Sequence, residues 1–135
     1  MRTSDSSRAI VISNGRLAMI HRRKNGKEYF VVPGGGVEDY ETIEEAVKRE
    51  LWEETSLKLT KSKPWFGGDY WGGHIYYFLC EAEGEKLELL GEEKERNTKD
   101  NWYRPEWVDL SMLKELTVYP ENLVEKLVEG KFLVK

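Results

Sequence analysis

The feature that most constrains the fold is a change of hydrophobic period after the glycine run Gly34–Gly36. From Tyr40 to Thr55 the apolar residues recur at spacings of three and four, which predicts one amphipathic helix. The residues that define this face are Ile43, Ala46, Val47 and Leu51. Apolar runs on both sides of this segment are short and bounded by turn residues, so they predict β-strands around a single central helix.

Six short apolar runs predict strands, and two further segments predict helices near the end of the chain. The predicted strands cover residues 8–12, 17–21, 29–32, 57–59, 74–82 and 103–108, and the predicted helices cover residues 111–116 and 120–129. Asn14-Gly15 is a strong hairpin signal, and Pro105 favours an edge strand or a bulge. Residues 84–100 are mostly polar and predict a long loop or a mobile hairpin. The order of these strands and helices along the chain predicts an α+β or layered α/β/α domain.

Length and composition narrow the class of protein. A chain of 135 residues with 39% hydrophobic residues suits one compact domain. A net charge of −4 argues against a protein that coats nucleic acid, and the single cysteine, Cys80, excludes an intrachain disulfide and a cysteine-rich zinc site. The first seven residues lack the apolar core of a signal peptide, and no apolar run approaches the length that spans a bilayer. We therefore expect a cytoplasmic protein without a membrane partner.

Three carboxylates of the predicted helix are the first candidates for chemistry. Glu50, Glu53 and Glu54 are three or four positions apart and project from one face, where like charges repel each other. A solvated acidic face is one interpretation. Bound divalent cations beside the glycine loop are the other, because Mg²⁺ prefers oxygen ligands. Arg49 adjoins the cluster and is positioned to pair with a carboxylate such as Glu41.

The full spacing of this segment resembles the box of the Nudix hydrolase family, whose pattern is G-x5-E-x7-R-E-U-x-E-E-x-G-U with U a bulky aliphatic residue. The matching residues are Gly35, Glu41, Arg49, Glu50, Leu51, Glu53, Glu54 and Leu57. The final glycine of the pattern is Ser56 in this chain. That position ends the helix, where glycine relieves a left-handed conformation, so the exchange affects the helix end and removes no metal ligand.

The resemblance implies a single domain over residues 1–135 with a Nudix-type α/β/α sandwich, a mixed β-sheet and a loop-helix-loop box. It also implies a metal site for Mg²⁺, with Mn²⁺ as an alternative. The ligands implied are the carboxylates of Glu50, Glu53 and Glu54 and the backbone carbonyl of Gly34. Arg49 and Glu41 would orient these ligands.

The catalytic base differs between members of the family, so several residues stay open. Glu50 and Glu53 are candidates within the box, and Glu93 is the favoured candidate in the later polar segment. Glu92 and Glu95 are its alternatives, and a solvated charge run is the competing interpretation for all three.

Substrate contacts are expected from basic and aromatic residues. Arg22 or Arg23 resembles the basic residue that many family members place near substrate phosphates, although either could equally be a solvated strand end. Four aromatic residues lie among glycines that predict a loop: Trp65, Phe66, Tyr70 and Trp71. We expect Tyr70 and Trp71 to contact a nucleotide base, with core packing as the alternative.

The resemblance predicts a metal-dependent hydrolase that splits a phosphoanhydride bond in a nucleoside diphosphate linked to another moiety, with modified nucleoside triphosphates among the candidates. The partner would be a nucleotide-type small molecule, with no stable nucleic-acid partner. Members of the family often form dimers, so the resemblance leaves a homodimer open. The alternative is a non-catalytic module that binds nucleotides or RNA as a sensor. All three box carboxylates are present, which favours the hydrolase.

Overall fold

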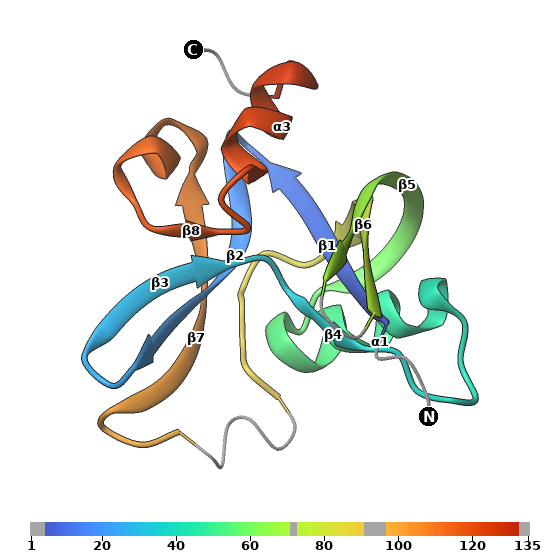
Figure 1. Cartoon of the computed structure of the whole chain (residues 1–135), viewed down its shortest axis with the longest axis horizontal. Coiled ribbons are helices and arrows are strands. Elements are labelled where there is room, and N and C mark those ends of the chain that lie inside the picture. Colours follow the sequence, from blue (N-terminus) through green and yellow to red (C-terminus); the bar gives the residue numbers. More distant parts are fainter. Residues whose placement is uncertain (1–4, 71–72, 91–96, 133–135) are drawn as a thin grey trace.

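The computed structural model describes residues 5–70, 73–90 and 97–132 (Figure 1). In chain order the strands are β1 (Ser6–Ser13), β2 (Arg16–Lys24), β3 (Lys27–Val31), β4 (Gly34–Gly36), β5 (Lys58–Tyr70), β6 (Gly73–Glu83), β7 (Asn101–Asp109) and β8 (Val118–Tyr119). The helices are α1 (Ile43–Thr55), the 3-10 helix η1 (Leu110–Glu115) and α3 (Leu123–Glu129). In these described ranges, no helix has both the length and the apolar character that a bilayer crossing needs.

The strands form one curled, mixed sheet. Its order is β5-β6-β1-β2-β3-β8, and β4 and β7 are attached to β1 and β2 respectively. The β1–β6 and β3–β8 pairs are parallel, and the other pairs are antiparallel. The predicted mixed sheet is therefore confirmed. Pro105 lies in β7, which pairs with β2 alone among the described strands, so the predicted edge position holds.

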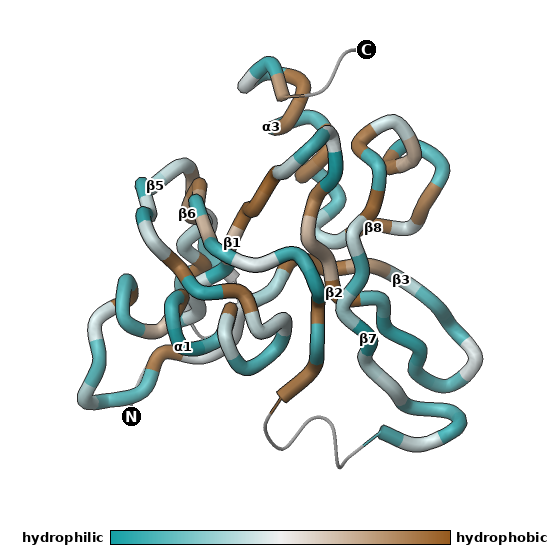
Figure 2. The backbone as a smooth tube through the Cα atoms, turned by 180° about the vertical axis from the view of Figure 1, so that it is seen from behind, coloured by the Kyte–Doolittle hydropathy of each residue, from teal (hydrophilic) through white to brown (hydrophobic). Residues whose placement is uncertain are grey.

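Helices cover both faces of this sheet because side chains alternate along its central strands. From β1, Ile10 points into a core cluster that also buries Leu123 and Leu127 of α3. Its neighbours Ala9 and Val11 point the other way, into a cluster built on α1. Figure 2 shows the apolar stretch of β1 running through the middle of the molecule, between α1 and α3. The layered α/β/α arrangement is confirmed.

The helix α1 begins at Ile43 rather than at Tyr40, because Thr42 caps it. The hydroxyl of Thr42 accepts a hydrogen bond from the amide of Glu45 at 3.0 Å, and the Glu45 carboxylate accepts one from the amide of Thr42 at 2.8 Å. This reciprocal capping box satisfies two amides that the first turn leaves without helical partners. The preceding residues form the loop that carries Glu41.

The glycine-rich stretch after residue 64 is a strand, so the predicted loop was wrong. Trp65 and Phe66 belong to β5 and pack against the core beneath α3. Phe66 stacks on Tyr77 at a ring distance of 4.4 Å. A Cβ at Gly67 would lie 2.6 Å from the ring of His74, so this glycine marks a close approach between β5 and β6.

The polar segment after β6 is in part fixed against the end of α1. The amides of Glu88 and Leu90 donate to the carbonyls of Thr55 and Glu53 at 2.9 and 2.6 Å. Leu89 is buried at the same place. Residues 88–90 of the segment predicted as a long loop or a mobile hairpin are therefore docked against α1.

Ser56 ends α1 in the left-handed conformation, with φ of 65°. Its amide donates to the carbonyl of Trp52 at 2.9 Å, and its hydroxyl donates to the carbonyl of Lys86 at 3.1 Å. A residue with a Cβ is strained in this conformation by about 1 kcal/mol relative to glycine. The side-chain hydrogen bond, with a net value of about 1 kcal/mol, offsets that strain.

We expect Ser56→Ala to lower the free energy of unfolding by about 1 kcal/mol, because it keeps the left-handed strain and loses the hydrogen bond. Ser56→Gly loses both the left-handed strain and the hydrogen bond, so its free energy of unfolding is expected to stay close to that of the wild type. Urea denaturation of the three proteins measures this. Equal stabilities for the alanine and glycine variants would show that left-handed strain at residue 56 is absent.

Candidate active site

The glycine loop lies directly between β1 and α1. Gly34 has φ of 154°, and a Cβ there would collide with the carbonyl oxygen of Ser7. A Cβ at Gly35 would lie 2.7 Å from the carboxyl carbon of Glu50. Gly34 therefore has to be glycine so that β1 can pack against it, and the absence of a side chain at Gly35 lets the Glu50 carboxylate lie directly against the loop.

Two contacts hold α1 at this loop. The buried hydroxyl of Ser7 donates to the carbonyl of Ile43 at 2.8 Å, which fixes the first turn of the helix to β1. The amide of Gly34 donates to the Glu54 carboxylate at 2.8 Å, which fixes the last turns. Val47 and Leu51 are buried beneath the helix. Glu50 and Glu54, three residues after each of them, lie beside this buried face and reach the glycine loop.

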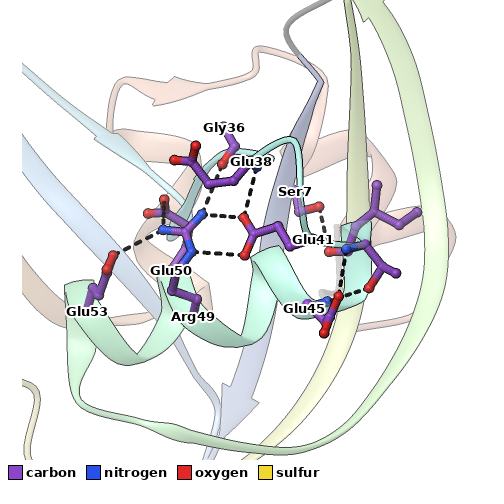
Figure 3. A network of polar contacts seen from close by, with 10 residues as sticks. Ser7, Gly36, Glu38, Glu41, Glu45, Arg49, Glu50 and Glu53 are labelled. Carbon is purple, nitrogen blue, oxygen red and sulfur yellow. Dashed lines mark hydrogen bonds and ion pairs between the residues drawn. The ribbon is translucent and has the colours of Figure 1, made fainter.

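The guanidinium of Arg49 joins these carboxylates (Figure 3). Its Nε and Nη2 donate to the two carboxylate oxygens of Glu41 at 3.1 and 2.6 Å. Its Nη1 donates to Glu50 at 2.8 Å and to Glu53 at 3.1 Å. The carbonyl of Gly36 accepts a further bond from Nη2 at 3.1 Å. One cation thus bridges three carboxylates and the loop.

The pair of Glu41 and Arg49 is largely shielded from solvent on the side of the carboxylate. Only 7% of the Glu41 side chain is exposed, against 29% for Arg49. The hydrogen bonds from Arg49 hold the pKa of Glu41 below its usual value, against the opposing effect of burial. The carboxylates of Glu41 and Glu50 in turn raise the pKa of Arg49, so the guanidinium stays charged.

The box carboxylates are near each other without forming a preformed cation cage. Glu50 and Glu53 each turn an oxygen to Arg49, and Glu54 turns one to the amide of Gly34. In residues 5–70, 73–90 and 97–132, no three His, Cys, Asp or Glu side chains converge on a common point that could hold a metal ion. The predicted ligand set stays a prediction, and a cation would have to displace protein donors to use it.

A cleft of about 480 Å³ opens beside this network. Glu50 and Glu54 line it together with the glycine loop. The other lining residues come from β1, β2, β3 and β7, and they are Arg8, Ile20, Arg22, Tyr29, Val31 and Tyr103. The cleft therefore has carboxylates and cationic side chains around one space, which suits a substrate that carries both phosphates and metal ions.

Arg22 is held firmly at this cleft. Its Nε donates to the hydroxyl of Tyr29 at 2.8 Å, and its Nη2 donates to Asn101 at 3.2 Å. The guanidinium carbon lies 3.8 Å from the ring centroid of Tyr103, a cation–π contact. Its Nη1 is buried and has no hydrogen-bond partner among the described residues.

Arg23 lies elsewhere because neighbouring residues of a strand point to opposite faces. It pairs with Glu28 at 3.2 Å and is not among the residues that line the cleft. Of the two arginines considered from the sequence, the structure brings Arg22 to the box residues and leaves Arg23 on the other face.

Among the charged and aromatic residues that line the cleft, three were not singled out from the sequence as site residues: Arg8, Tyr29 and Tyr103. Arg8 donates to the carbonyl of Val32 at 3.1 Å. The sequence feature that could have indicated Arg8 as a site residue is its charge at the start of an otherwise apolar strand. Other expected site residues lie outside the described part of the chain: Glu92, Glu93, Glu95 and Trp71, together with the side chain of Tyr70.

The family is established by comparison with known proteins. The family model described as the NUDIX domain matches residues 3–127. The chain therefore belongs to the NUDIX family. Four of the residues that match the family's box form the network around the guanidinium: Glu41, Arg49, Glu50 and Glu53.

The relatives carry different names. An ADP-ribose pyrophosphatase of Methanocaldococcus jannaschii is 31% identical over 131 residues, which cover 90% of this chain and 71% of the relative. An RNA pyrophosphohydrolase of Wolbachia sp. subsp. Drosophila simulans is 34% identical over 90 residues, which cover 64% of this chain. The match spans about half the length, 48%, of that relative.

Solved structures agree on the fold. MutT from Aliivibrio salmonicida and Vibrio cholerae matches with a TM-score of 0.73 at 18% identity, covering 94% of this chain and 98% of that one. The E. coli ORF135 protein matches with a TM-score of 0.72 at 18% identity, and the match covers 97% of this chain and 92% of that one. At these identities the likeness extends to the fold alone.

The lowered pKa of Glu41 predicts a pH-dependent stability. Its folded pKa lies below the ordinary value of 4.5, so its contribution is complete at higher pH and is lost as the pH falls through the folded pKa. We expect wild type to melt higher than Glu41→Gln at pH 6–8 in EDTA, with a gap that narrows below about pH 4.5. Calorimetry of both proteins measures the gap. A gap that is independent of pH would contradict the ion pair.

Proposed function

We propose that the protein hydrolyses a phosphoanhydride bond in a nucleotide-type small molecule, with a divalent cation as cofactor. The observation that supports this most directly is the composition of the cleft. Two box carboxylates, Glu50 and Glu54, line the same space as Arg8 and Arg22. Carboxylates attract metal ions and guanidinium groups attract phosphates, so a metal–polyphosphate complex satisfies both.

The donor set fits a hard cation. Glu50, Glu53, Glu54 and the carbonyl of Gly34 offer oxygen atoms only, which Mg²⁺ prefers and Mn²⁺ accepts. The absence of a side chain at Gly35 leaves the Glu50 carboxylate directly against the loop. We propose these four residues as the ligands. When bound, the cation would offset the negative charge that develops on the phosphate oxygens.

The residues of the chain have distinct proposed roles. Arg8 and Arg22 bind the phosphates, and Arg22 is kept in place by Tyr29 and Tyr103. We propose Glu53 as the carboxylate that takes a proton from the attacking water at its Oε atoms, because 34% of its side chain is exposed compared with 13% for Glu50. Glu93 stays the alternative.

The names of the relatives support hydrolysis of a phosphoanhydride bond, and they do not agree on the group that departs. An RNA pyrophosphohydrolase and an ADP-ribose pyrophosphatase share a phosphoanhydride as the bond that breaks. A cleft of about 480 Å³ suits a small molecule, and a net charge of −4 does not favour a nucleic acid. We therefore propose a nucleoside diphosphate linked to a second group as the substrate class.

A panel assay tests this function. The panel contains normal and modified nucleoside triphosphates, ADP-ribose, NADH, nucleotide sugars and dinucleoside polyphosphates. We expect at least one to be cleaved at an anhydride in the presence of Mg²⁺ or Mn²⁺, and we expect EDTA to abolish the cleavage. Binding of nucleotides without any cleavage would support the sensor module instead.

We expect Glu53→Gln to lower kcat on the best substrate by at least about 10²-fold, because it removes a proton acceptor and a proposed ligand. Glu44→Gln is the matched control: Glu44 lies in the first turn of the same helix, is exposed and is not among the residues that Arg49 contacts. Unchanged kcat in a folded Glu53→Gln protein would remove Glu53 from the mechanism, and an equal loss in both variants would indicate a general effect of charge.

A further inference from the structure

Arg49 contacts the same carboxylates that the proposed cation would bind. This inference rests on the proposed function and concerns the state of the site before the cation arrives. We propose that Arg49 is a built-in counter-cation, which neutralises Glu50 and Glu53 in the metal-free protein and releases them when a divalent cation binds. Arg49 thereby competes with the cation and lowers its affinity.

The guanidinium is divided into two functional edges (Figure 3). The edge with Nε and Nη2 makes a bidentate pair with Glu41 and also reaches the carbonyl of Gly36. The remaining nitrogen, Nη1, bridges Glu50 at 2.8 Å and Glu53 at 3.1 Å. Because the two edges use different nitrogens, Nη1 can lose its partners while the other edge stays docked on Glu41.

The contacts also explain why the box carboxylates do not converge in this state. Glu50 and Glu53 are a turn apart on one helix face, where unscreened like charges repel. A guanidinium between them relieves the repulsion and draws one oxygen of each toward Nη1. Glu54 turns instead to the amide of Gly34, so the oxygens of the three carboxylates do not meet at one point in the described ranges.

A divalent cation faces two costs at such a site. It has to break the two hydrogen bonds from Nη1, and it has to bind within the field of the positive charge that Glu41 anchors there. Removal of Arg49 takes away both costs. A residue that only oriented the ligands would have the opposite effect, because its removal would disorder the ligands and weaken cation binding.

Titration of the protein with Mn²⁺, followed by electron paramagnetic resonance of the free ion without substrate, separates these two roles. We expect Arg49→Gln to bind Mn²⁺ at least about fivefold more tightly than the wild type. The matched control is Lys48→Gln, which removes the same charge from the neighbouring position of the helix. Lys48 is exposed and lies beside Trp52, away from the cleft. The Mn²⁺ affinity of the Lys48→Gln variant is therefore expected to stay within about twofold of the wild type.

Each outcome of the titration bears on a different claim. No Mn²⁺ binding to the wild type at millimolar concentrations would overturn the proposed function, and the counter-cation with it. Binding to the wild type with equal or weaker binding to Arg49→Gln would overturn the counter-cation alone. Equal tightening in Lys48→Gln would do the same, because a distant charge would then explain the effect.

A second measurement uses the wild type and so does not depend on the folding of a variant. In protein labelled with ¹⁵N-arginine, the two edges of Arg49 report separately on Mg²⁺ binding. We expect saturating Mg²⁺ to release the restricted rotation of the Nη1 group, while the Nε–H bond to Glu41 stays protected from exchange. Unchanged Nη1 signals at saturation would overturn the proposal.

Discussion

Mutual repulsion between carboxylates on one helix face is the constraint around which the site is built. Glu50 and Glu53 lie together on α1, and a third carboxylate, Glu41, faces them from the loop. Arg49 relieves the repulsion by contacting all three at once. The glycine loop, the cap at Thr42 and the tether from Ser7 position the helix so that this one cation can do so.

The sequence predicted the fold where the signal is local. The spacing of apolar residues by three and four predicted the helix that ends at Thr55. Asn14-Gly15 predicted the first hairpin, and these two turn residues have φ of 53° and 73°. The strand β5 was mistaken for a loop because its glycines resemble turn residues. At Gly67 the absence of a side chain permits a close approach to His74 on the neighbouring strand, which a single sequence cannot reveal.

The site was predictable to the extent that it lies in one segment. Spacing on a helix shows that three glutamates share a face, and the position of Arg49 suggested a pair with Glu41. Spacing does not fix the direction of a carboxylate, so the bridge from Arg49 to Glu50 was not foreseen. The cleft joins residues from four strands with the box, and only the sheet topology brings Arg8 and Tyr103 to one place.

The most direct test of the account is a crystal structure with Mn²⁺ and a nucleotide whose anhydride oxygen is replaced by a methylene group. We predict anomalous scattering from Mn²⁺ bound to oxygens of Glu50, Glu53 and Glu54, with the phosphates in the cleft lined by Arg8 and Arg22. Nucleotide bound in that cleft with no Mn²⁺ among these carboxylates, and with Arg49 still bridging Glu50 and Glu53, would contradict it.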